Sequence, residues 1–122
     1  MEAMREYVAE FLNQFKFAVE SKMCDFVPRT RLESDLASLN LTRNAALDII
    51  CSLTPENYSR GPEPDDSDQR KEVWVFGCNL DGVELYLKLR LVPQKSGPTR
   101  ASVWSFHKAE HRLLYPFAKR RS

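Results

Sequence analysis

The chain has 122 residues, enough for one domain with one core, and its apolar (43%) and charged (29%) fractions are those of an ordinary globular protein. Its longest apolar runs are four or five residues, so the sequence predicts no membrane span. The amino-terminal segment carries acidic residues and no continuous apolar stretch, which argues against a signal peptide and favours a cytoplasmic protein. We expect a single domain over residues 1–122.

The net charge of +1 conceals a division along the chain. Residues 86–122 hold nine basic residues and one acidic residue, a net charge of +8, so the first 85 residues carry −7. A basic half of this kind indicates a polyanionic partner. Residues 119–121 supply three of the nine basic charges and are also typical of an ordinary solvated chain end.

The first forty residues are predicted to be mainly helical. Apolar residues at helical spacing predict an amphipathic helix over 3–14. Residues 15–28 alternate weakly and indicate one or two short strands. Leucines at helical spacing predict a short helix over 32–40.

A better-defined helix is predicted over 41–53, where apolar residues form a broad face. Thr42 is its expected N-cap, and Pro55 ends it. Residues 56–71, rich in Pro, Gly, Asp and Ser, predict a loop that is longer than most and is therefore either functional or disordered. Its acidic part either covers the basic region or remains mobile.

The second half of the chain predicts three strands, over 72–78, 84–91 and 101–106, with an Asp-Gly turn after the first. Helices followed by antiparallel strands indicate an α+β fold in which a small antiparallel sheet packs on the N-terminal helices. Residues 108–122 form a C-terminal tail, and we expect the Tyr-Pro-Phe sequence at 115–117 to pack an aromatic anchor against the body.

Strand alternation divides the second of these strands into two faces. Its leucines point one way and Tyr86, Lys88 and Arg90 the other. In the last strand, alternation predicts Trp104 and Phe106 on one face. It places Val103, Ser105 and His107 on the opposite face.

These polar residues suit metal-free cleavage of RNA by its own 2′-hydroxyl, a reaction that needs a base, an acid and positive charge at the phosphate. His107 is the candidate acid or base, because histidine exchanges protons near neutral pH. Lys88 supplies charge, and Tyr86 donates a hydrogen bond or stacks on a base. Arg60, Arg90 and His111 are assigned to substrate binding.

Other interpretations of the same residues remain open. A polar face on a solvated antiparallel strand is common, and the basic face then serves a non-catalytic RNA- or protein-binding domain. His107, Glu110 and His111 also suggest a metal site, although no further nearby ligand completes it. The three cysteines are far apart, which argues against a disulfide framework or a zinc ribbon and favours reduced thiols.

The order of these segments resembles the MqsR-like branch of the RelE-type toxins, the small RNases of bacterial toxin–antitoxin pairs. The resemblance covers residues 40–117. It rests on Leu-Thr-Pro-Glu-Asn-Tyr at 53–58, Val-Trp-Val-Phe-Gly at 73–77, Glu-Leu-Tyr-Leu-Lys-Leu at 84–89 and Ser-Phe-His at 105–107.

The resemblance implies a RelE-like fold and an mRNA-cleaving endoribonuclease that needs no metal or other cofactor and that a cognate antitoxin protein holds inactive. It places Tyr86 on a family active-site tyrosine. His107 stands where the best-known members have lysine, Ser59 and Arg60 stand near a family lysine, and Val75 replaces a family glutamine.

Overall fold

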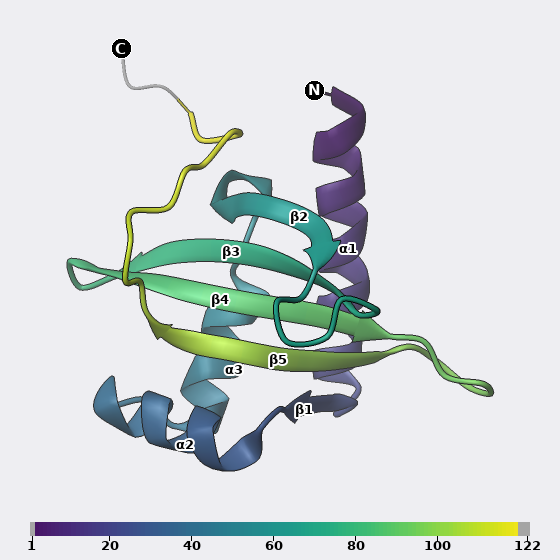
Figure 1. Ribbon diagram of the computed structural model, residues 1–122, viewed down its shortest axis with the longest axis horizontal. Helices are drawn as coiled ribbons and strands as arrows, with labels where there is room; N and C mark the ends of the chain where they lie inside the picture. Colours follow the sequence, from purple (N-terminus) through teal and green to yellow (C-terminus); the bar gives the residue numbers. More distant parts are fainter. Residues whose placement is uncertain (1, 120–122) are drawn as a thin grey trace.

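The computed structural model describes residues 2–119. A five-stranded sheet forms one layer, and the helices form a second layer on one of its faces, so that in Figure 1 α1 and α3 lie behind the sheet. The predicted α+β class is confirmed. Among residues 2–119, no helix combines the length and the apolar character that crossing a membrane requires.

The first helix, α1 (Glu2–Glu20), is longer than predicted. Phe15 and Ala18 are buried whereas Phe17 is 64% exposed. Over so few residues, this helical pattern of burial resembles the alternation of a strand. The strand predicted within 15–28 is therefore restricted to β1 (Cys24–Phe26).

The two shorter helices agree with the sequence. Helix α2 (Arg29–Ser38) begins after Pro28, three residues earlier than predicted, and buries the leucines of its apolar face. Helix α3 (Arg43–Cys51) starts at the predicted N-cap, where the Thr42 hydroxyl accepts a hydrogen bond from the Ala45 amide at 3.0 Å.

The sheet has the strand order β1-β5-β4-β3-β2. Strands β3 to β5 form the predicted antiparallel run and β2 extends it, but β1 pairs with β5 in parallel, so the sheet as a whole is mixed. The four strands that follow the helices are β2 (Tyr58–Pro64), β3 (Glu72–Leu80), β4 (Val83–Val92) and β5 (Arg100–Lys108).

Half of the predicted loop 56–71 is ordered secondary structure. A short 3-10 helix (Pro55–Asn57) leads into β2, an irregular edge strand whose pairing with β3 shifts register twice. Prolines at positions 62 and 64 argue against predicting a strand from the sequence. An edge strand tolerates them because its outer side has no neighbouring strand and needs no ladder hydrogen bonds. The remaining loop, 65–71, folds back over the open face of the sheet (Figure 1).

The leucine face of β4 forms the centre of the core, as predicted. Leu85, Leu87 and Leu89 are fully buried and pack in one cluster with the apolar faces of all three helices. Their burial fixes which way β4 faces, since the alternate side chains must then point to the open side of the sheet.

The segment after β5 crosses the end of the sheet and is anchored at two places. Tyr115 donates a hydrogen bond to the Glu84 carboxylate at 2.7 Å, and the Phe117 ring stacks on Tyr58 at 5.5 Å between centroids. A Cβ atom at Gly77 would overlap the Tyr115 hydroxyl, so glycine is required where the tail crosses β3. The predicted aromatic anchor is confirmed; the end of the predicted tail, 120–122, lies outside the described residues.

Candidate functional site

The open face of the sheet brings Tyr86 and His107 together. They are direct neighbours in the pairing of β4 with β5, and their rings stack with centroids 5.2 Å apart and planes inclined by 15°. Both side chains are partly exposed on the side opposite the buried leucines. The imidazole predicted as an acid or base therefore points away from the core.

The alternation predicted for β5 is wrong at two residues, Val103 and Trp104. A bulge interrupts the pairing: Lys88 pairs with Ser105 but Leu89 pairs with Val103. Trp104 is the extra residue, and alternation restarts after it. Val103 is consequently buried in the core, whereas the Trp104 indole lies on the open face and donates a hydrogen bond to Ser102 at 2.9 Å.

Arg60 reaches the same place from the edge strand β2. Its Nη2 donates a hydrogen bond to the Tyr86 hydroxyl at 3.3 Å, and its guanidinium carbon lies 5.9 Å from the centre of the Tyr86 ring. Glu63 forms an exposed ion pair with the same guanidinium at 2.7 Å. Arg60, assigned to substrate binding from the sequence, therefore lies beside Tyr86 at the sheet edge.

Lys88 differs from its neighbours because its charge is already paired. Its Nζ lies 2.8 Å from Oδ1 of Asp65, a residue that is only 2% exposed. Burial alone would raise the Asp65 pKa, but hydrogen bonds from Lys88 and Ser67 outweigh it and hold that pKa at about 2. The acidic part of the loop was expected either to cover the basic region or to remain mobile. At Asp65 it covers the basic face, since it pairs with Lys88.

Arg90 is the one predicted site residue that lies apart from the others. Its Nη1 donates a hydrogen bond to the carbonyl oxygen of Glu72 at 3.2 Å. Its guanidinium lies 5.9 Å from the centre of the Trp104 ring, where Lys71 also approaches at 5.6 Å. Strand parity placed Arg90 on the correct face, but His107 pairs with Tyr86, and Arg90 lies four residues further along β4, beyond the reach of the imidazole.

A cavity of about 420 Å³ unites the remaining predicted residues. Its walls come from β2, β4, β5 and the start of the tail. Arg60, Tyr86, Lys88, His107 and His111 all line it, together with residues that were not assigned a role in RNA cleavage or RNA binding: Asp66, Ser105, Glu110, Arg112 and Leu113.

The hydrogen bond of His107 assigns roles to its two ring nitrogens. Nδ1 lies 2.9 Å from the carbonyl oxygen of Lys108, which can only accept, so Nδ1 carries the proton. Nε2 of the neutral ring then holds a lone pair. This tautomer is the one that a general base requires.

Two contributors to the site had weak sequence signals. Asp65 belongs to the acidic run that the sequence marks as a possible cover, but its particular pairing with Lys88 joins residues that are 23 positions apart. The signal for Ser105 was weak because the alternation that placed it on the open face also placed Val103 there, whereas the bulge at Trp104 leaves Val103 in the core. Val75 pairs with Lys88 in the ladder and is fully buried.

The potential metal ligands and the cysteines of the described residues are distributed as follows. Within residues 2–119 no group of three or more His, Cys, Asp or Glu side chains is placed to hold a metal ion. Cys24, Cys51 and Cys78 are free thiols, and burial raises the pKa of Cys24 to about 12.

Comparison of this chain with protein-family models, with curated proteins and with solved structures finds no match.

Proposed function

We propose that this protein is a metal-independent endoribonuclease that cleaves mRNA and acts as the toxin of a toxin–antitoxin pair. The contact between His107 and Tyr86, in a cavity that Arg60 also lines, carries the proposal. An imidazole, a phenol and a guanidinium supply proton transfer, a hydrogen bond and positive charge to one phosphate. The +8 charge of residues 86–122 supports a polyanionic substrate.

In the proposed reaction His107 is the base. Its Nε2 takes the proton of the 2′-hydroxyl, whose oxygen then attacks the adjacent phosphorus. The bond from phosphorus to the 2′-oxygen forms as the bond to the 5′-oxygen breaks, which leaves a 2′,3′-cyclic phosphate. Arg60 and Tyr86 donate to the non-bridging oxygens; the Tyr86 oxygen accepts from Arg60, so its own proton remains available to the phosphate.

His111 is the proposed acid for the leaving 5′-oxygen, because it lines the same cavity and a histidinium yields a proton near neutral pH far more readily than a phenol does. Lys88 has a supporting role, since Asp65 already neutralises its charge. One histidine must then start unprotonated and the other protonated, and the rate should depend on pH as a bell.

Incubation of the purified protein with RNA in excess EDTA tests the proposal. We expect cleavage that leaves 2′,3′-cyclic phosphate ends, a loss of roughly 100-fold or more in His107→Ala, and a smaller loss in Tyr86→Phe. The matched control is Lys108→Ala, an exposed neighbour on the same strand. Full activity of His107→Ala contradicts the mechanism, and salt-sensitive RNA binding without any product favours a non-catalytic RNA-binding domain.

A modified substrate separates the acid from the base. An RNA analogue with sulfur in place of the leaving 5′-oxygen needs no protonation of its leaving group. We expect it to restore cleavage by His111→Ala but not by His107→Ala. Rescue of Tyr86→Phe instead would assign the acid to Tyr86.

Induction in bacteria should arrest growth with the original protein and not with His107→Ala, and a cognate antitoxin should relieve the arrest.

A further inference from the structure

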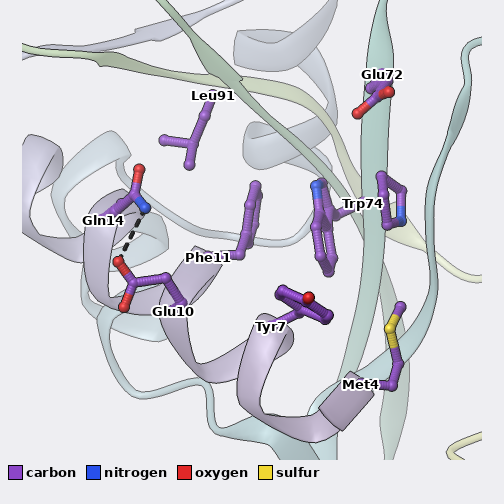
Figure 2. Close-up of a pocket in the computed structure, with 9 residues that line it drawn as sticks. Met4, Tyr7, Glu10, Phe11, Gln14, Glu72, Trp74 and Leu91 are labelled. Atoms are coloured by element: carbon purple, nitrogen blue, oxygen red, sulfur yellow. Dashed lines mark hydrogen bonds between the residues drawn. The ribbon is translucent and has the colours of Figure 1, made fainter.

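A second surface lies between α1 and the sheet edge, away from the His107 cavity. It is a groove of about 450 Å³ whose residues come from the first half of α1 and from β2, β3 and β4 (Figure 2). Its floor is aromatic: the Phe11 and Trp74 rings stack with centroids 4.5 Å apart. Tyr7 stands at its mouth and is 66% exposed.

The charges on this groove all have one sign. Glu10 projects from α1 and Glu72 from β3, so the two exposed carboxylates occupy opposite walls of the aromatic floor (Figure 2). Gln14 donates a hydrogen bond to Glu10 at 3.0 Å and holds that carboxylate beside the groove. No lysine or arginine lines this groove in the described part of the chain.

The exposed surface of α1 continues the groove along the helix. Tyr7, Glu10, Gln14 and Phe17 follow one another at helical spacing, and Phe17 is itself 64% exposed. Ten residues of helix extend about 15 Å, which is about the length of three turns of a second helix. Two large exposed aromatics on one side of a helix indicate a surface that becomes covered by a partner.

We propose that this surface, formed by the groove and the exposed side of α1, binds a basic amphipathic helix of a partner protein. Apolar side chains of that helix enter between Tyr7 and Trp74, and its lysines or arginines meet Glu10 and Glu72. The charge complementarity selects against acidic partners and against RNA, which the opposite face of the sheet suits. The inference does not depend on the proposed nuclease activity.

A synthetic peptide provides the probe. We would label a peptide of about four helical turns with leucines along one face and lysines and arginines on the others, and measure its binding by fluorescence anisotropy. The comparison peptide has the same composition in an order without an apolar face. We expect the amphipathic peptide to bind at least about tenfold more tightly, a difference of 1.4 kcal/mol.

Charge reversals in the protein locate the contact. The double variant Glu10→Lys with Glu72→Lys should weaken binding about tenfold, since each reversal replaces attraction to a basic side chain of the peptide with repulsion. The matched control is Glu33→Lys with Asp48→Lys, which makes the same change in net charge at exposed positions of α2 and α3, outside the proposed surface. We expect that control to change affinity less than about twofold, as distant exposed charges are screened.

Trp74 reports on occupation of the groove directly. The chain has two tryptophans, so in a Trp104→Phe background the fluorescence of Trp74 should shift when the amphipathic peptide binds, and Tyr7→Ala should abolish the shift. Equal losses in both double variants, or equal binding of both peptides, would overturn the proposal. So would concentration-dependent dimerisation that Tyr7→Ala abolishes, because it assigns the groove to a second copy of this chain.

Discussion

The two faces of β4 alternate residue by residue and yet serve opposite purposes. Leu85, Leu87 and Leu89 have no exposure at all, and all three belong to the core cluster. Tyr86 and Lys88 lie between them in sequence and take part in contacts with residues from three other segments of the chain. The rigid buried face of β4 therefore holds the polar face in position, although the two faces share no residue.

Leu87→Ala gives the largest expected effect on stability. Truncation of a fully buried leucine should reduce the free energy of unfolding by about 2–5 kcal/mol, measured by urea denaturation. The matched control is Leu114→Ala, the same substitution at a residue that is 77% exposed, which should change stability by less than about 0.5 kcal/mol. A similar loss at both positions would erase the distinction between the two faces.

The ion pair of Lys88 with Asp65 gives the next largest expected effect on stability. Unlike the other contacts of Tyr86 and Lys88 on the open face, it involves a buried carboxylate. Lys88→Met should cost roughly 3 kcal/mol, since it leaves the Asp65 carboxylate buried without its partner. Arg70→Met breaks the exposed pair with Asp68 and should cost less than about 1 kcal/mol.

The reverse change tests whether the loop restrains the site. Asp65→Asn should cost less than Lys88→Met, because the Lys88 ammonium retains some access to water. The freed charge should also strengthen RNA binding. Unchanged affinity for RNA in Asp65→Asn would show that Lys88 does not face the bound phosphates.

Acid stability gives the smallest expected effect. The Asp65 pKa of about 2 lies below its usual 3.8, so the ionised carboxylate stabilises the fold above about pH 4, and this contribution is lost as the pH falls toward 2. The full contribution is about 2 kcal/mol. Unfolding measured between pH 2 and pH 5 should show a steeper decline for the original protein than for Asp65→Asn; parallel curves would exclude a role for this carboxylate.

Periodic segments were predictable, and contacts between distant segments were not. The alternation of β4 and the capped start of α3 follow from local patterns that the core enforces, and both are confirmed. Strand β2 was missed because its prolines and glycine satisfy the rules for a loop equally well. The end of α1 was missed because four or five residues are too few to distinguish a helical period from a strand period.

The candidate site divides in the same way. Tyr86 and His107 could be placed on one face from alternation, but their direct pairing depends on the register of β5, which the bulge at Trp104 sets. The ion pair of Lys88 with Asp65 depends on a loop that returns over the sheet, and no local pattern encodes that return. The sequence thus predicted which residues line the cavity better than it predicted the contacts between them.

The bulge in β5 has a consequence for how this region is expected to vary among homologous chains. Trp104 is the one supernumerary residue of the strand, so a chain without it would run in regular alternation and still present Ser105 and His107 on the open side. Loss of Phe106 instead would remove a buried ring and turn the His107 imidazole toward the core. A one-residue gap at position 104 of an alignment should therefore be harmless. In a chain with that gap, the histidine one position earlier in sequence is the structural equivalent of His107.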